Sequence, residues 1–258
     1  MKKEIKDLKV AANERFSESL FCLKLTCEEP LPEMRPGQFV EVRVDGSGKV
    51  FLRRPISIHF VDRQRNELWL LIQMVGEGTR QLSQLQPGDL VNVLLPLGNG
   101  FSPVGKEGER VLLVGGGVGI APLLEYGKYL KENGAQPVFL LGAKSENGFV
   151  ELPLFEQYGP VYLTTEDGSR GERGFVTQHS ILSRERFDRI SVCGPGPMMK
   201  AVGRFALKGN IPCEVSLENR MACGLGACLC CVEQTVRGNV CVCQEGPVFD
   251  IRELRVES

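Results

Sequence analysis

The chain has 258 residues, more than a single domain usually contains, and this length predicts two compact domains with a small appendage. Its 31 basic and 32 acidic residues give a formal net charge of −1, so the overall charge does not favour nucleic acid or an anionic membrane as partner. The charged N-terminus lacks the apolar core of a secretory signal, and no apolar run reaches the length of a membrane span. We therefore expect a soluble, cytoplasmic protein.

Short strand-forming runs separated by Gly and Pro fill the first hundred residues. Strands are predicted over 38–44, 56–61, 68–74 and 90–95, with a short helix over 79–85. This spacing predicts an antiparallel β-barrel over residues 1–104.

Two features of this barrel suit phosphate. Gly76-Glu-Gly78-Thr79 opens the predicted helix and is a candidate phosphate cradle. The pair Arg53-Arg54 offers planar forks of hydrogen-bond donors that match phosphate oxygens. Taken alone, an arginine pair at a strand edge is more often an ordinary charged surface.

From Arg110 onward, apolar strand runs alternate with helical patterns. Strands are predicted over 111–114, 138–141, 161–164 and 190–193, with one helix ending near Gly134 and another over 197–207. A repeated strand-then-helix order predicts a parallel, doubly wound sheet, which we assign to residues 105–211.

A glycine-rich turn follows the first of these strands, in the run Val111-Leu-Leu-Val-Gly115-Gly-Gly-Val-Gly-Ile-Ala-Pro122. Backbone amides where such a turn becomes a helix can hold a phosphate. The run departs from the standard dinucleotide fingerprint, because Ile120 stands at the third glycine position. A tight connection without a ligand is the alternative.

Six of the ten cysteines fall between Cys223 and Cys243, in a C-terminal segment with little room for a core of its own, which we assign to residues 212–258. The spacing Cys223-x4-Cys228-x2-Cys231, followed by Cys243, is that of plant-type [2Fe-2S] proteins. Small residues in the loop permit close approach to an inorganic cluster. Zinc more often shows two separated short-spaced pairs, and incidental buried cysteines are the last alternative.

We predict Cys223, Cys228, Cys231 and Cys243 as the cluster ligands. The spacing by itself does not decide between Cys241 and Cys243.

The combination of the barrel, Gly117-x-Gly-x-x-Pro122 and Cys193-Gly-Pro-Gly-Pro197 resembles the ferredoxin-reductase family of flavoproteins. The resemblance implies FAD in the barrel, with Arg54 at the pyrophosphate, Ser57 near the isoalloxazine ring, and Ile56 in place of the family's tyrosine. It also implies that Cys193 lies beside the nicotinamide. The cofactor-binding residues expected on this basis are Arg54, Pro55, Ile56, Ser57, Leu71, Ile72, Gln73, Gly78, Thr79, Gly115, Gly116, Gly117, Gly119 and Pro122.

The C-terminal run Glu218-Asn-Arg-Met-Ala-Cys223-Gly-Leu-Gly-Ala-Cys228, with Cys243-Gln-Glu-Gly-Pro-Val-Phe249, is similar to the electron-transfer subunits of type B dihydroorotate dehydrogenases. That resemblance implies a partner subunit that carries FMN and oxidises dihydroorotate in pyrimidine biosynthesis, in a complex with two copies of each chain. Electrons would pass through the [2Fe-2S] cluster and FAD to NAD, and no residue of this chain is assigned as a general acid or base. NAD is favoured over NADP because only Lys144 follows the second strand of the nucleotide-binding fold.

Two alternatives remain open. One is the flavoprotein subunit of a ferredoxin-dependent NAD(P) transhydrogenase, a sulfide dehydrogenase or a hydrogenase, which share this modular plan. The other is a non-catalytic, zinc-binding interaction module.

Overall fold

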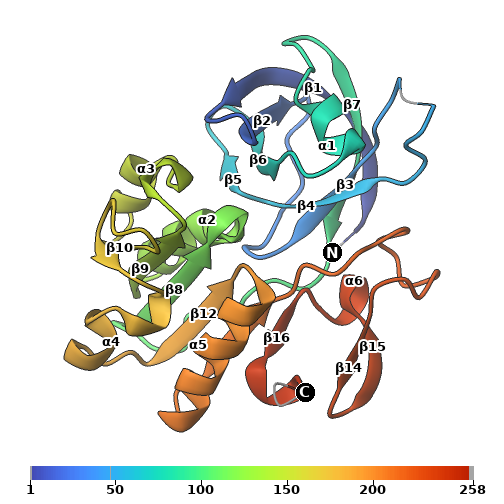
Figure 1. The fold of residues 1–258 in the computed structure, drawn as a ribbon. Helices are drawn as coiled ribbons and strands as arrows, with labels where there is room; N and C mark the ends of the chain where they lie inside the picture. Colours follow the sequence, from blue (N-terminus) through green and yellow to red (C-terminus); the bar gives the residue numbers. More distant parts are fainter. Residues whose placement is uncertain (1, 47, 256–258) are drawn as a thin grey trace.

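The computed structural model describes residues 2–46 and 48–255. Its first unit is an antiparallel sheet that curls into a barrel, drawn in blue to cyan in Figure 1. Helix α1 (Glu77–Leu82) lies between the last two of its strands in the chain. In spatial order the strands are β4 (Arg54–Ser57), β3 (Phe39–Val42), β7 (Leu90–Leu97), β1 (Glu4–Arg15), β2 (Leu20–Thr26), β6 (Glu67–Gln73) and β5 (Phe60–Asp62).

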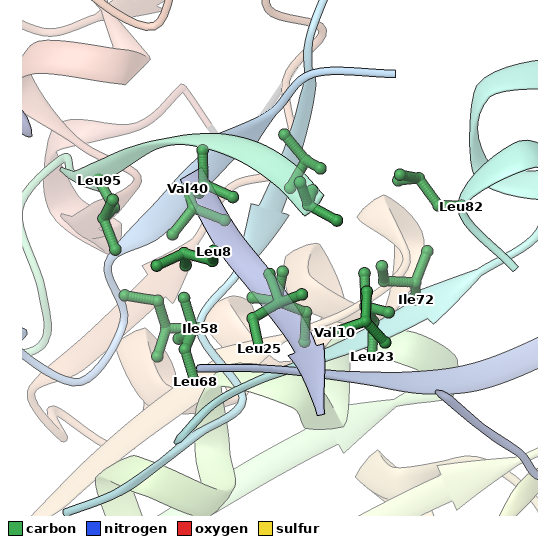
Figure 2. Close-up of a cluster of buried hydrophobic side chains, with 14 of the residues drawn as sticks. Leu8, Val10, Leu23, Leu25, Val40, Ile58, Leu68, Ile72, Leu82 and Leu95 are labelled. Carbon is green, nitrogen blue, oxygen red and sulfur yellow. The ribbon is translucent and has the colours of Figure 1, made fainter. Parts of the chain in front are cut away.

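Aliphatic side chains from across this sheet meet inside the barrel, where Figure 2 shows Leu8 and Val10 of β1 near Leu23 and Leu25 of β2. Burial of these apolar groups is the main force that closes the barrel. Strands β1 and β2 were not among the predicted ones. Charged residues interrupt the apolar positions of β1, whereas β2 is a nearly continuous apolar run that the prediction missed.

The predicted strand over 56–61 is two strands, β4 and β5, in the structure. Between them the chain leaves its pairing with β3, and the backbone N–H of His59 donates to the Trp69 carbonyl of β6 at 3.0 Å. This bend carries the chain from one end of the sheet to the other and so closes the barrel.

The second unit is a mostly parallel sheet flanked by helices. Its strands, in spatial order, are β11 (Glu172–Arg173), β10 (Val161–Thr165), β9 (Gln136–Ala143), β8 (Arg110–Gly116), β12 (Arg189–Cys193), β13 (Cys213–Ser216) and β16 (Val248–Asp250). Its helices are α2 (Ala121–Glu132), α3 (Leu152–Glu156), α4 (Ile181–Arg184) and α5 (Gly196–Lys208), with 3₁₀ turns at Gly117–Ile120, Glu146–Gly148 and Val176–Gln178.

The strand order of this sheet reverses at β8, because β9 lies on one side of it and β12 on the other. Ligands of open α/β sheets bind at such a switch point, beyond the carboxyl ends of the strands. The barrel and the doubly wound sheet confirm the predicted fold class.

The C-terminal segment contains the hairpin β14 (Val232–Thr235) and β15 (Gly238–Cys241), helix α6 (Val242–Glu245) and a 3₁₀ turn at Ile251–Glu253. This segment, drawn in orange and red in Figure 1, contacts both other units. Strand β16 pairs antiparallel with β13, and Cys231 and Cys243 pack in one apolar cluster with Phe39 and Leu97 of the barrel. The cysteine loop is therefore anchored against the barrel.

Within the described residues, no helix combines the length and the apolar character that a membrane crossing requires.

Candidate functional site

A cavity of about 780 Å³ opens at the carboxyl ends of the parallel strands. Its walls include Gly116 at the end of β8, Ala143 at the end of β9, Thr164 on β10 and Pro195 after β12. Gln73, at the end of β6, brings the barrel to the same cavity. The cavity therefore lies at the switch point of the sheet and reaches the barrel.

The glycines of the predicted nucleotide turn have different surroundings. Gly116 and Gly117 line the cavity, and Gly117 has a left-handed φ of 57° that favours glycine. Gly115 faces the start of helix α2, where a Cβ would lie 2.9 Å from Ile120 Cγ2 in the preceding 3₁₀ turn and 3.0 Å from Leu123 Cδ1 of the helix. Pro122 is buried in the first turn of α2, where a missing backbone donor costs little.

Gly119 permits the closest backbone approach in this turn. A Cβ there would lie 2.5 Å from Gly194 Cα and 2.6 Å from the Cys193 carbonyl oxygen. The turn after β8 and the turn after β12 therefore touch backbone to backbone.

Cys193 is fully buried at the end of β12, and its thiol lies 3.9 Å from Glu218 Oε1. Glu218, rather than Cys193, lines the cavity. Burial, together with the nearby Glu218 carboxylate, holds the pKa of Cys193 well above its usual range. The surrounding protein raises the pKa of Glu218 by desolvation, although its side chain remains open to the cavity.

Glu218 was not predicted as a site residue. It precedes the cysteine loop in the chain, and no local motif marks it as a wall of the nucleotide cavity. Only the packing of the C-terminal segment beside β12 brings it there.

The predicted flavin residues lie along β4 and at the start of α1. The Arg54 guanidinium donates to the Leu52 carbonyl at 2.8 Å and covers Gly78, where a Cβ would lie 2.6 Å from Arg54 Nε. Ser57 is half-buried at the end of β4, and Pro55 pairs with β3. The arginine motif and the glycine motif thus meet in space.

Other predicted flavin residues have structural contacts. The Thr79 hydroxyl accepts from the Val75 and Gly76 backbone N–H groups at 3.0 and 3.2 Å, and so fixes the start of α1. The side chain of Ile72 is buried in the barrel core, and Ile56 packs against that core.

The three predicted residues of β6 face different surroundings. Leu71 is buried between the barrel and α2, whereas Ile72 points into the barrel. Gln73 is the one of the three that lines the nucleotide cavity. This alternation follows from the period of two in a β-strand.

The predicted cluster ligands gather in the C-terminal loop, with Cys241 among them. Cys223 interacts with Cys228, and Cys231 interacts with Cys243. In the described residues, no three His, Cys, Asp or Glu side chains surround one point as ligands of a single metal ion would. Backbone N–H groups point at these sulfurs, from Leu225 to Cys223 at 3.3 Å, from Gly226 to Cys243 at 3.1 Å and from Cys243 to Cys231 at 3.4 Å.

The two pairs differ in their surroundings. Burial acts to raise the pKa of Cys223, but hydrogen bonds from backbone N–H groups outweigh it and lower that pKa to about 6. Burial and the neighbouring Cys231 raise the pKa of Cys243 to about 12. Cys241 also interacts with Cys231, whereas Cys230 is exposed.

Glu41 is a further residue at this site that the sequence did not indicate. It is 0% exposed on β3, and neither carboxylate oxygen has a hydrogen-bond partner among the described residues. Desolvation raises its pKa to about 7. A Cβ at Gly224 would lie 2.9 Å from Glu41 Cγ, so the loop glycine next to Cys223 rests directly on this carboxyl side chain.

Family models match almost the whole chain in three parts. Residues 7–101 match an oxidoreductase FAD-binding domain, residues 113–204 an oxidoreductase NAD-binding domain, and residues 218–255 the iron-sulfur cluster binding domain of dihydroorotate dehydrogenase B. The fold, the cavity and the cysteine loop therefore define a flavin- and NAD-linked oxidoreductase subunit with an iron-sulfur segment.

Two curated relatives match over most of their length. The dihydroorotate dehydrogenase B (NAD(+)) electron transfer subunit of Caldanaerobacter subterraneus subsp. tengcongensis is 41% identical over 95% of this chain and 96% of the relative. That of Shouchella clausii is 43% identical over 85% of this chain and 86% of the relative. The chain belongs to the family of dihydroorotate dehydrogenase B electron transfer subunits.

Solved structures give the same architecture. A structure of an NADH-dependent reduced ferredoxin-NADP oxidoreductase, described in work on flavin-based electron bifurcation, superposes with a TM-score of 0.87 at 32% identity, over 97% of this chain and 90% of that chain. The ferredoxin reductase of carbazole 1,9a-dioxygenase has a TM-score of 0.69 at 20% identity, over 82% of this chain and 68% of that chain, and shares the fold.

Proposed function

We propose that this chain carries electrons from an FMN-containing dihydroorotate dehydrogenase catalytic subunit, through a [2Fe-2S] cluster and FAD, to NAD⁺. The observation that carries the proposal is the junction of three units, because the cysteine loop rests on the flavin barrel and Gln73 of that barrel lines the nucleotide cavity. When bound, the flavin supplies the conversion between single electrons and hydride. We place the unit boundaries at 1–104, 105–211 and 212–258, with β13 and β16 of the last segment completing the sheet of the second unit.

We assign Cys223, Cys228, Cys231 and Cys243 as the ligands of the cluster. The spacing of these four residues is that of plant-type [2Fe-2S] proteins, and four cysteine thiolates are the ligand set that such a cluster takes. Backbone N–H groups directed at the sulfurs would stabilise the charge that a reduced cluster carries. The loop glycines at 224 and 226, with φ of 65° and 78°, allow its tight curvature.

In the barrel, Arg54 would hold the flavin pyrophosphate, with Gly78 beneath its guanidinium. Pro55, Ile56 and Ser57 continue from Arg54 along the same strand. Gln73 reaches the nucleotide cavity from the barrel, and it would orient the nicotinamide toward the flavin side.

In the nucleotide unit, the backbone of Gly116 and Gly117 would contact the pyrophosphate of NAD. Lys144 and Glu166 line the same cavity beyond the ends of β9 and β10. The Glu166 carboxylate offsets the charge of Lys144, so this wall offers a 2′-phosphate no net positive charge, which supports NAD over NADP as the physiological nucleotide.

The surface around the cluster loop suits a protein partner. Leu225 and Leu229 are 43% and 64% exposed beside the exposed Cys228 and Cys230. Apolar side chains grouped on a surface mark interaction sites. We infer that this surface receives the catalytic subunit, in a cytoplasmic complex of two copies of each chain.

The ferredoxin-linked alternative is favoured by one finding, the 32% identity to the reduced ferredoxin-NADP oxidoreductase over nearly the full chain. In that case the same cofactor sites would serve a partner that exchanges electrons with ferredoxin. The two proposals differ in the partner subunit and not in this chain's own chemistry.

The deciding experiment is dihydroorotate-driven NAD⁺ reduction by the native complex, purified through a tag on this chain. Activity that depends on this chain, with dihydroorotate oxidised and NADH formed in equal amounts, supports the proposal. The purified complex could instead contain iron, acid-labile sulfide and FAD, fail to oxidise dihydroorotate, and exchange electrons between ferredoxin and pyridine nucleotides. That result would establish the ferredoxin-linked alternative.

A further inference from the structure

His59 connects the two cofactor-binding units. It follows Ser57 by two residues, and its imidazole is 0% exposed. Its Nδ1 lies 2.8 Å from the carbonyl oxygen of Ala121, the first residue of α2. Its Nε2 lies 2.9 Å from Oε2 of Glu151, which precedes α3. One side chain therefore joins the flavin strand to the helix that begins directly after the nucleotide turn.

The backbone beside His59 is bonded to the same helix. The Glu125 N–H donates to the His59 carbonyl at 3.2 Å, and Glu125 Oε2 accepts from the Val61 N–H at 3.0 Å. Ala121 and Glu125 are one helical turn apart, so His59 contacts consecutive turns of α2 through its side chain and its backbone. We call His59, Val61, Ala121, Glu125 and Glu151 the interdomain latch.

The chemistry of this latch uses both ring nitrogens of His59. The Ala121 carbonyl is only an acceptor, so Nδ1 must donate to it. The Nε2 atom and the Glu151 carboxyl then share one further proton between them. Removing either partner would leave the other buried without its hydrogen bond, which is strongly unfavourable.

The backbone of Glu151 also indicates a demanding position. Glu151 has a φ of 54°, in the left-handed backbone region that residues other than glycine rarely adopt. Such a conformation persists where the surrounding structure fixes it. Here it allows a carboxylate at the start of α3 to reach His59.

Apolar packing forms much of the remaining contact between the barrel and α2. Trp69 and Leu71 of β6 belong to one buried cluster with Leu123 and Tyr126 of α2. Apolar contacts have no preferred direction, whereas hydrogen bonds weaken steeply as their angle changes. The latch therefore restricts how the two units can slide against each other.

We propose that His59 is a positioning residue for hydride transfer, which fixes the approach of the flavin in the barrel to the nicotinamide in the cavity. This inference rests on the proposed function of the two sites. His59 lies on the segment that continues from β4, and Ala121 lies on the helix that continues from the glycine turn. A displacement of about 1 Å between reacting groups can cost about a hundredfold in rate.

The test is anaerobic stopped-flow reduction of FAD by NADH in the purified complex, with His59→Ala and Glu151→Ala. We expect the rate at saturating NADH to fall at least about tenfold in both, while the Kd for NADH stays within about twofold. The primary isotope effect with NADH deuterated at the transferred position should increase, since hydride transfer would become more fully rate-limiting. The charge-transfer absorbance of reduced FAD with NAD⁺ should weaken, which reports their stacking independently of rate.

Two variants act as matched controls. Glu151→Gln should retain most of the rate, because its amide can donate to the neutral Nε2 while Nδ1–H still donates to Ala121. His179→Ala removes the second histidine, whose Nδ1 accepts from the Ile181 N–H at 3.0 Å within the nucleotide unit. It should leave hydride transfer unchanged.

Unchanged FAD reduction, isotope effect and charge-transfer absorbance in both alanine variants, with only a lower Tm, would overturn the proposal. If His59→Ala fails to bind FAD, Glu151→Ala decides, because it lies outside the barrel. NADH delivers electrons to FAD directly, so this result does not depend on whether dihydroorotate is the physiological donor. If the complex does not oxidise dihydroorotate but His59→Ala still slows hydride transfer, the proposed catalytic partner is refuted and the positioning role of His59 is supported.

Discussion

Gly119 and Gly194 lie so close that a methyl group on Gly119 would stand 2.5 Å from the Gly194 Cα. The first belongs to the turn after β8 and the second to the turn after β12, neighbouring strands at the switch point. Val118, which precedes Gly119, and Pro195, which follows Gly194, line the nucleotide cavity. Contact between the two glycines therefore sets the separation of the cavity walls.

Gly119→Ala should impair NADH binding. The new Cβ meets backbone atoms that cannot move aside independently, so the two turns must separate. We expect the KM for NADH to rise at least about tenfold, while FAD and iron contents stay unchanged.

Gly196→Ala is the matched control for this prediction. Nothing lies within 4 Å of a Cβ at Gly196, which opens helix α5 after the second of these turns. Equal KM values in the two variants would contradict the role assigned to the Gly119 contact.

Cys228→Ser should remove the [2Fe-2S] cluster and spare FAD, because the flavin residues belong to the separate barrel. Iron and acid-labile sulfide analysis, together with EPR of the reduced protein, measures the loss. Cys230→Ser changes an exposed neighbouring thiol and should retain the full cluster. Normal iron content in Cys228→Ser would refute the ligand assignment.

Iron analysis also identifies the fourth ligand. Cys243 is buried against Cys231 and receives the Gly226 N–H, whereas Cys241 is half-buried. We expect Cys243→Ser to lose the cluster and Cys241→Ser to keep it. The reverse result would transfer the ligand role to Cys241.

Glu218→Gln should weaken the binding of NAD⁺ more than that of NADH. A carboxylate in the wall of the cavity attracts the cationic nicotinamide of NAD⁺, and NADH lacks that charge. We expect the ratio of the two Kd values to change about fivefold, as measured by calorimetry. Because burial raises the pKa of Glu218, the difference between the two nucleotides should grow as pH rises through the range in which this carboxyl ionises, so the Kd values are compared across a pH series.

Glu214→Gln removes an equal charge from a different cavity, where Glu214 Oε1 accepts the Ser102 N–H at 3.0 Å. It should leave the ratio of the Kd values unchanged. A similar change in both variants would assign the effect to net charge and not to the position of Glu218.

Glu125 links stability to pH. Desolvation raises the pKa of its carboxyl above the ordinary value of 4.5. The native state then holds this proton more tightly than the unfolded chain, so the contribution of Glu125 to the free energy of unfolding declines as pH rises above about 4.5.

Glu125→Gln should remove this decline, because an amide oxygen still accepts from Val61 but does not ionise. We expect its Tm to exceed that of the wild type at neutral pH, by about 2–4 °C for each kcal/mol gained, with the difference vanishing near pH 4. Glu156→Gln, an exposed change on α3, should follow the wild type. A decline with pH in Glu125→Gln that parallels the wild type would contradict the assigned cause.

Much of the fold and of the candidate site could be predicted from the local spacing of residues. The Cys-x4-Cys-x2-Cys spacing, the glycine turn before α2 and the alternating strands and helices are each set by a few neighbouring residues, so they are visible in the chain itself. The boundaries of short elements were harder to predict from the sequence. The bend at His59 that divides β4 from β5, for example, depends on the hydrogen bond from the His59 N–H to the Trp69 carbonyl of β6.

The modular order and the candidate cluster ligands could be predicted from residue type and spacing along a covalent chain, and the FAD and NAD sites from the resemblance that these motifs carry. Three contacts became visible only in the folded chain: Glu218 lines the nucleotide cavity, Glu41 lies buried beneath the cluster loop, and His59 joins the two units. Each of these contacts links residues far apart in the chain. Their proximity arises from sheet register and from burial of apolar surface, which no local pattern encodes.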